Sequence, residues 1–474
     1  MKGFVKATDR GSERLAYGWM LLSVLSLVFA GVFALMVALA RTPVIEDMLP
    51  LGRDYIYVAL VGHVVLAVVI WFLAFEGFLW VHTSTAHLGQ RVWSAPLGWA
   101  SLLLSASGVF FVVVSAVFGL GPAELANYVP VLLTPVFYAG LLLFASGILL
   151  NLVNTAVTVL KARSEGVRLP STTLGMCVAG AAVFVAFLCF ALSGYFQYAT
   201  GKVYLDFERL FWGGGHILQF ANTIAMVSAW VYLSAIVLKE GRISGPWAKS
   251  LFLVYMVFIL PAPFIYFMHD TSSQAHRDSF TKLMQWGLGP STAVFMLYFL
   301  WAMFREKGRS WGDPGFSSLF LSIAIFIMGG VIALNINGVN TIIPAHYHCV
   351  IGAVTIAFMG LFYRIVPLFG RRVYSMRLAK AQPYLYSLGI VLFAVGLFLA
   401  GSHGVARKTY GAEQNLNNIG KLIGMSIMGV GGIVAIAGGI AFVWNALLTL
   451  LGRGQAVCAA DMEKEVEVMG LKRY

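Results

Sequence analysis

The stretch Thr341-Ile-Ile-Pro-Ala-His346-Tyr347-His348-Cys349-Val-Ile-Gly352 opens a long apolar run and decides how the rest of the chain is interpreted. Two histidines two residues apart on a helix point about 200° away from each other, because an α-helix has about 3.6 residues per turn. They cannot bind one metal ion together, but each can bind a different one on opposite sides of the same helix. Imidazoles inside a membrane span are costly unless they are hydrogen-bonded or bound to a ligand. The pair therefore predicts two cofactors beside one helix, the alternative being rings satisfied by neighbouring hydroxyls and carbonyls.

The composition identifies the class of protein. The chain has 474 residues, of which 59% are hydrophobic and 11% charged, and its mean hydropathy is +0.84. A soluble protein of this size cannot bury so much apolar surface, so we expect a polytopic membrane protein. The first apolar run is too long for a signal-peptide core and is followed by further spans, which indicates a retained helix. The cysteines form no CxxC pair, so neither a structural zinc site nor a covalently attached c-type haem is expected.

The apolar segments predict an all-α fold with about twelve transmembrane helices, each long enough to cross a hydrocarbon core of ~30 Å. They fall at roughly 17–40, 55–82, 97–119, 127–153, 171–197, 208–238, 246–268, 279–304, 314–334, 341–366, 379–401 and 421–451. We therefore expect a cytoplasmic N-terminal tail over 1–16, a membrane domain over 17–452 and a cytoplasmic C-terminal tail over 453–474. The abundant glycines indicate close helix packing, since no Walker motif or dinucleotide fingerprint occurs.

The net charge of +12 reflects membrane topology. With both termini in the cytoplasm, 23 of the 32 Lys and Arg residues fall on the cytoplasmic side and nine on the opposite side. This asymmetry follows the positive-inside rule and supports cytoplasmic termini. We expect the protein to lie in the cytoplasmic (inner) membrane, in contact with lipid. A nucleic-acid partner is therefore not expected.

Several histidines fall at one depth when this topology is applied. They lie in the outer third of the membrane, early or late in four different predicted helices: His63, His216, His269, His346 and His348. Neutral imidazole is the usual protein ligand of haem iron, copper and non-haem iron. A solute transporter would explain the spans and the glycines, but it would not explain this clustering.

Taken together, these residues resemble subunit I of the haem–copper oxidase and nitric oxide reductase superfamily. The resemblance covers nearly the whole chain, and the His-Tyr-His of the tenth helix is its most specific motif. It implies two haems, b-type being favoured, with His63 and His348 on the two faces of a low-spin haem and His346 on a high-spin haem. It also suggests that Arg53 and the pair Arg407-Lys408 meet haem propionates, the alternative for the pair being an ordinary interfacial anchor.

The match is incomplete at the distal metal, iron or copper, which the family holds with three histidines. His216 corresponds to the first of them, and His269 to one of an adjacent pair that closes the seventh helix. Met268 or Asp270 occupies the other position of that pair; a thioether suits copper(I), and a carboxylate suits iron. Seven residues further on, His276 is a third candidate nitrogen. The distal site is thus either unusual or vacant.

A second departure concerns tyrosine. Oxygen reductases of this family carry a tyrosine linked to a distal histidine, and the matching position on the sixth helix is Phe220. Nitric oxide reductases lack this tyrosine, because joining two NO molecules needs only two electrons. Gln219, close to the distal position, is a candidate hydrogen-bond donor to bound substrate.

The sequence therefore favours the catalytic di-haem subunit of a respiratory complex that reduces nitric oxide to nitrous oxide. Electrons are expected from a c-type cytochrome or a copper-containing partner subunit. Two alternatives stay open: a terminal oxidase that reduces O2, and a non-catalytic b-type electron-transfer subunit with a degenerate distal site.

Overall fold

The structure is a computed structural model that describes residues 9–45, 48, 52–201, 204–238, 245–306, 308 and 310–452. The predicted tail over 453–474 and the first half of the tail over 1–16 lie outside the described residues. Within the described part, twelve helical spans are long and apolar enough to cross a membrane. The prediction of an all-α, multi-pass membrane protein is confirmed.

The helices follow one another with short connections, and several spans are made of more than one segment. In chain order they are α1 (Arg10–Ala40), α2 (Arg53–Val64) with a π-helical segment (Val65–Ile70) and α3 (Trp71–Thr85), α4 (Ala95–Val117), α5 (Pro135–Ser164), α6 (Ser171–Ala199), α7 (Phe207–Val237), α8 (Pro246–Ile259) with α9 (Ile265–Met268), α10 (Gln274–Arg305), α11 (Pro314–Ala333), α12 (Ile342–Ile365), α13 (Met376–Ser402) and α14 (Ile419–Leu450).

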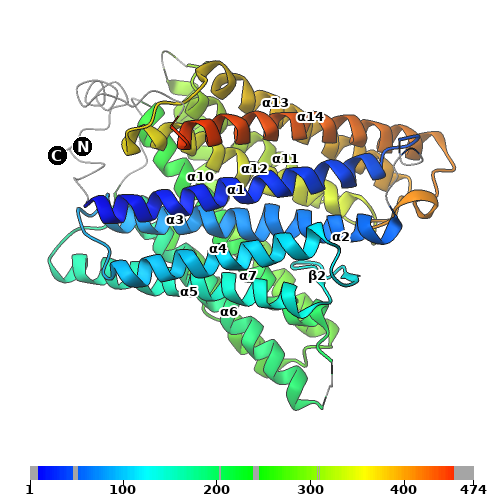
Figure 1. The fold of residues 1–474 in the computed structure, drawn as a ribbon, viewed down its shortest axis with the longest axis horizontal. Helices are drawn as coiled ribbons and strands as arrows, with labels where there is room; N and C mark the ends of the chain where they lie inside the picture. Colours follow the sequence, from blue (N-terminus) through cyan, green and yellow to red (C-terminus); the bar gives the residue numbers. More distant parts are fainter. Residues whose placement is uncertain are drawn as a thin grey trace.

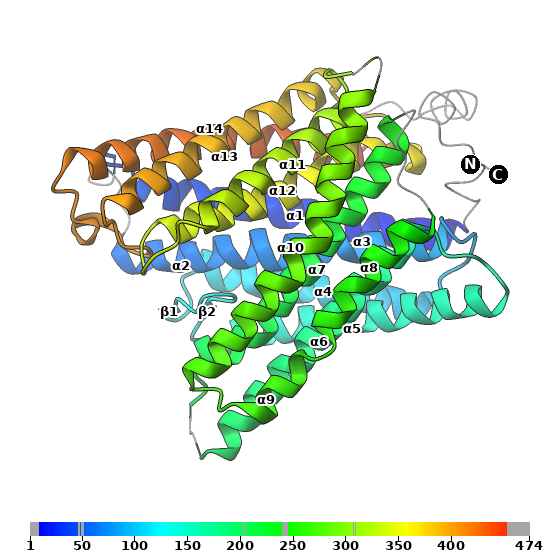
Figure 2. The ribbon, with the colours of Figure 1, turned by 180° about the vertical axis from the view of Figure 1, so that it is seen from behind.

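Two helices form the centre of the bundle. In α7 and α12, 83% of the most apolar stretch is buried inside the protein, a larger share than in any other described span. Helices α1, α2–α3, α13 and α14 run side by side along the long axis (Figure 1). Helices α6 and α8–α10 diverge from them toward one end (Figure 2). Residues carried by α7 and α12 are therefore screened from lipid by the surrounding helices.

The fourth span begins later than the sequence predicts. Residues 127–134, expected in a helix over 127–153, instead belong to a short antiparallel hairpin of β1 (Ala123–Glu124) and β2 (Val131–Leu132), and α5 begins at Pro135. Proline is favoured at the first helical position because it has no N–H to leave unpaired, whereas Pro130 would interrupt a helix interior. The hairpin lies beside α2 (Figure 2).

The first span begins earlier than the predicted tail boundary. Helix α1 starts at Arg10, where the Asp9 side chain accepts a hydrogen bond of 3.3 Å from the Ser12 N–H. An acidic N-cap satisfies one of the unpaired N–H groups of a first helical turn. The helix therefore includes residues that hydropathy alone assigns to the tail.

Glycines bring α13 and α14 into backbone contact. A Cβ atom added at any of them would lie within 2.6 Å of the partner helix's backbone: Gly389, Gly396, Gly424, Gly431 and Gly438. Close approach through small residues is a main source of helix association in membranes, because lipid tails are as apolar as the side chains. The glycine abundance is thus explained by packing.

We expect Gly396→Ala to destabilise this helix pair, because the added methyl group would lie 2.3 Å from the Met428 nitrogen. Overpacking of this kind costs about 1–3 kcal/mol, to be measured as the free energy of unfolding in detergent. Gly312→Ala, outside the central cavity, is the control, since its methyl group meets no atom within 4 Å. Equal effects of the two substitutions would contradict this packing.

Candidate functional site

One large cavity, about 1450 Å³ in volume, lies among α1, α2, α7, α10, α12 and α14. Four of the predicted histidines line it: His63 from α2, His216 from α7, and His346 and His348 from α12. Segments far apart in the sequence thus bring their imidazoles to a common space. The lining is otherwise mostly aliphatic and aromatic, which excludes water and suits a flat, apolar cofactor.

Each of these imidazoles is fixed by a backbone carbonyl through its Nδ1 atom. His63 Nδ1 lies 3.2 Å from the Ala30 oxygen, His346 Nδ1 2.8 Å from the Gly329 oxygen, and His348 Nδ1 2.7 Å from the Pro344 oxygen. A carbonyl only accepts, so Nδ1 must carry the proton and Nε2 must carry the lone pair. A second partner of this kind orients most metal-binding histidines and raises their basicity.

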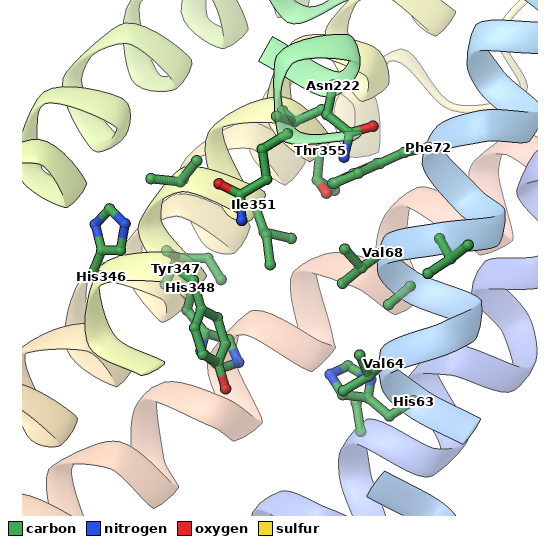
Figure 3. A pocket seen from close by; sticks show the side chains of 18 of the residues that line it. His63, Val64, Val68, Phe72, Asn222, His346, Tyr347, His348, Ile351 and Thr355 are labelled. Atoms are coloured by element: carbon green, nitrogen blue, oxygen red, sulfur yellow. The ribbon is translucent and has the colours of Figure 1, made fainter. Parts of the chain in front are cut away.

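The histidines divide the cavity into two parts. His63 and His348 project from opposite walls into the same space, whereas His346 turns to the other side of α12 (Figure 3). This is the divergence that the spacing of two residues predicts. The part between His63 and His348 has a histidine on each side, as a six-coordinate haem requires. In the other part, α12 contributes only His346.

The walls leave room for a macrocycle. At Gly31, Gly330 and Gly439, all of which line the cavity, an added Cβ atom would meet no other atom within 4 Å. The space in front of these glycines is therefore open. Side chains there would occupy the volume that a porphyrin needs.

A buried guanidinium that the sequence reasoning missed adds a reason to expect an acidic cofactor. Arg41, at the end of α1, lines the cavity, and its Nε and one terminal nitrogen are buried without a hydrogen-bond partner among the described residues. Burial lowers the pKa of this guanidinium, but Arg remains protonated in proteins. Unpaired buried N–H donors on a cation require an anion such as a propionate. In the sequence, the only sign of this cavity residue is that Arg41 directly follows an apolar run.

The predicted basic pair also lines the cavity. The Arg407 guanidinium donates to Asn127 Oδ1 at 2.8 Å, and the Lys408 ammonium donates to the same oxygen at 2.9 Å and to the Leu125 carbonyl. Lys408 has a φ of 59°, a left-handed conformation that costs free energy outside glycine and is found at functional sites. Burial, and to a smaller extent the neighbouring Arg407, lower the pKa of Lys408 to about 8, while Glu208 opposes them.

Arg53 lies elsewhere. It forms an ion pair with Glu413 at the surface and does not line the cavity. Of the predicted propionate candidates, the structure therefore brings Arg407 and Lys408 to the site, and Arg41 takes the place expected for Arg53.

The distal side holds a histidine–tyrosine pair. His216 Nδ1 donates to the Trp212 carbonyl at 2.7 Å, so its Nε2 accepts, and the Tyr128 hydroxyl lies 3.0 Å from that Nε2. Burial, with a smaller effect of Glu208, raises the pKa of the Tyr128 phenol, which keeps the group protonated as a donor. Gly215 makes this contact possible, because a Cβ there would lie 2.2 Å from the Tyr128 ring.

The distal side therefore holds a phenol, although Phe220 stands at the family's tyrosine position on the sixth helix. Tyr128 comes from the β1–β2 connection, which the sequence assigned to a helix, and no spacing rule connects it to His216.

The other predicted distal residues do not reach the cavity. His269, Met268 and Asp270 are absent from its lining; Met268 is 71% exposed, and Asp270 accepts hydrogen bonds from Ser272. The physical reason is the break between α8 and α9, after which His269 ends the helix in an extended conformation. His276 on α10 is buried, but the Phe280 ring packs on both His276 and His216, at 5.1 and 6.0 Å between ring centroids.

The donor set does not fit a distal metal. Among the residues that the structure describes, no group of three His, Cys, Asp or Glu side chains is placed to hold a metal ion. The lone pair of His216 is already engaged by Tyr128. Of the residues beside it, Gln219 lines the cavity, whereas Phe220 is fully buried and packs toward Gly287 on α10.

Known proteins match this chain over nearly its whole length. The sequence pattern of the family described as cytochrome C and quinol oxidase polypeptide I covers residues 14–441. The chain belongs to this family. An uncharacterized protein of Aquifex aeolicus is 33% identical over 383 residues, which is 79% of this chain and 90% of that protein. Subunit 1 of the cytochrome c oxidase of Thermus thermophilus is 24% identical over 453 residues, covering 87% and 79% of the two chains.

The fold of the family is also found by structural comparison. A structure described as a heme-copper terminal oxidase dimer superposes with a TM-score of 0.74 at 18% sequence identity, covering 98% of this chain and 91% of that one. The predicted membership of the haem–copper superfamily and the subunit I-like fold are confirmed.

For the low-spin haem, we expect His63→Ala to abolish the six-coordinate spectrum and to leave a high-spin haem on His346. The measurement is the absorption and electron paramagnetic resonance spectrum of the purified protein. His403→Ala is the control, because His403 makes the same Nδ1 bond, 2.9 Å to the Leu399 carbonyl, outside the cavity. A normal low-spin signal in His63→Ala would exclude this ligand assignment.

For Lys408, we expect the midpoint potential of the adjacent haem to fall as the pH rises through about 8. Below that pH the ammonium is charged and stabilises the reduced haem, which carries one more negative charge than the oxidised form; above it the stabilisation is lost. Lys408→Met should remove this step from the pH titration of the potential. Lys421→Met, outside the cavity, should retain it, and a step that survives in Lys408→Met would point to another group.

Proposed function

We propose that this chain is the di-haem subunit of a respiratory membrane complex, in which electrons reach a diatomic gas at the second haem. The observation that carries the proposal is the set of three cavity-lining imidazoles, His63, His348 and His346, whose Nδ1 protons are held by carbonyls. His63 and His348 would hold a low-spin haem, b-type, and His346 a high-spin haem. Arg41, Arg407 and Lys408 would neutralise their propionates.

Bound haem iron supplies the electron-transfer step and the coordination position at which a gas binds. The chain's own residues supply binding, orientation and proton placement. The apolar lining excludes water from the site. The Tyr128 hydroxyl holds a proton 3.0 Å from His216 Nε2, and the Gln219 side chain lines the same cavity.

We place O2 first as the substrate. Four-electron cleavage of O2 needs two electrons and two protons more than the two-electron coupling of two NO molecules. A buried phenol bonded to a histidine is able to supply one of each. Tyr128 and His216 form such a pair, which removes the argument that favoured nitric oxide. The named relative from Thermus thermophilus, a cytochrome c oxidase subunit, agrees with this choice.

Nitric oxide reduction is the second candidate. It is favoured by the fully buried Phe220, which stands where the family's oxygen reductases carry their tyrosine on this helix. For either gas, we expect the electron donor to be a c-type cytochrome or a copper-containing subunit, since the sequence has no CxxC motif.

The test is gas consumption by the purified complex with one artificial electron donor, O2 and NO being measured separately. We expect faster O2 uptake than N2O formation at equal electron supply. Tyr128→Phe should slow O2 reduction by about 10²–10⁴-fold, the range for a lost proton donor, and leave both haem spectra intact. Tyr384→Phe, whose hydroxyl bonds the Trp311 carbonyl far from the cavity, is the matched control.

Other outcomes distinguish the alternatives. N2O formation with negligible O2 uptake would move nitric oxide to first place. Failure with both gases despite intact haems would leave a b-type electron-transfer subunit as the function.

A further inference from the structure

A carboxyl group lies buried within a membrane span without a partner. Glu76 on α3 is fully buried, and neither of its oxygens has a hydrogen-bond partner among the described residues. An isolated carboxylate in such a place is very costly, so the group is retained as a neutral acid unless a proton acceptor is supplied. Ionisable residues inside membrane spans mark ion or proton pathways more often than structural sites.

The position of Glu76 on α3 connects it with the cavity. Phe72 and Leu73, which line the cavity, lie one turn earlier on the same face of the helix. The helical rise puts Glu76 about 6 Å along the axis beyond Phe72. Thr83 is seven residues further on and lies on this face again, where its carbonyl accepts a hydrogen bond of 3.2 Å from the Thr173 hydroxyl of α6.

A second group of buried titratable side chains lies where α3 ends. His82 Nε2 lies 3.0 Å from the Tyr232 hydroxyl of α7, and the rings of His82 and His87 are 5.3 Å apart between centroids. Thr173 Oγ1 lies 3.4 Å from His87 Nδ1, and His87 Nε2 is buried without a partner among the described residues.

This histidine pair lies at the end of the bundle where α1 begins. The chain leaving α3 bonds to the first turn of α1, since the Val92 N–H donates to Ser12 Oγ at 3.0 Å. That end is the one the charge distribution assigns to the cytoplasm. His82 is six residues beyond Glu76 on α3, about 9 Å of helical rise, so a relay between the two groups needs bound water.

The other elements that pack on α3 bring few titratable groups to this line. Tyr232 on α7 contacts both histidines, its ring centroid lying 5.0 Å from that of His87. Tyr17 on α1 is directed away and bonds the Leu450 carbonyl. Helix α5 contributes the neutral Asn151, whose amide donates to the Gly77 carbonyl at 3.2 Å.

We propose that Glu76 is a proton-relay residue that connects the His82–His87 pair with the cavity. The inference rests on the proposed function, because reduction of O2 or NO consumes one proton for each electron. Glu76 releases its carboxylic proton toward the cavity. The carboxylate then takes a proton from the imidazolium of the pair, which regains one from water at that end of the bundle. No group in the relay is oxidised or reduced, and the electrons come from the donor through the haems.

The test is infrared difference spectroscopy of haem reduction, combined with turnover. In the wild type we expect reduction to change the carbonyl stretch of a protonated carboxylic acid. This band should be absent in Glu76→Gln and shifted in Glu76→Asp. It should be unchanged in Glu165→Gln, an exposed carboxyl near the same end of the bundle that bonds Gln90.

Turnover should follow the infrared result. Glu76→Gln should lower the rate of gas reduction by about a hundredfold with normal haem spectra, and Glu76→Asp should restore part of it. His87→Asn should slow turnover while the Glu76 band remains, and this variant tests the relay if Glu76→Gln binds no haem.

A carboxyl band that persists in Glu76→Gln, or turnover at the wild-type rate in that variant, would overturn the relay. A wild type that reduces neither gas would overturn the proposed function instead. The infrared measurement needs only haem reduction and would still decide the role of Glu76.

Discussion

The site depends on one repeated interaction, the hydrogen bond between a histidine Nδ1 and a backbone carbonyl. It fixes His63, His346 and His348 so that the lone pair of each Nε2 is free for a ligand. In a membrane interior the free-energy penalty for an imidazole without hydrogen bonds is large, and the carbonyl satisfies one of its two ring nitrogens. The remaining nitrogen still needs a partner. In the proposed function that partner is a haem iron, and the helices around the cavity stand at a distance that leaves room for it.

Packing by small residues keeps that distance. Glycines let α13 and α14 touch along their backbones, while other glycines on α1, α11 and α14 face open space in the cavity. The same residue type thus serves two purposes, close contact between helices and room for a macrocycle. The cavity persists because its outer helices are bound to one another rather than to what fills it.

The distal side shows how the chain departs from its family's pattern. A phenol engages the lone pair of His216, and the seventh span breaks before His269 would reach the cavity. Both features remove nitrogen ligands from a distal metal. His216 Nε2 cannot bind a metal while it accepts the Tyr128 hydrogen bond, and His269 does not reach the cavity. In the proposed function the chemistry on this side is proton placement by Tyr128, His216 and Gln219. The proposed relay through Glu76 would extend it toward the opposite membrane surface.

The sequence by itself determined the features that repeat along one helix. Hydropathy predicted the twelve spans, and the spacing of His346 and His348 predicted their divergence, because both depend on residues close together in the chain. The orientation from charge asymmetry stays a prediction. Only the tertiary structure decided which distant residues meet. Tyr128 reaches His216 through a hairpin that has no hydropathy signal of its own, and Arg41 enters the cavity because α1 packs on α2. His269 is carried away by a helix break whose direction no local pattern specifies.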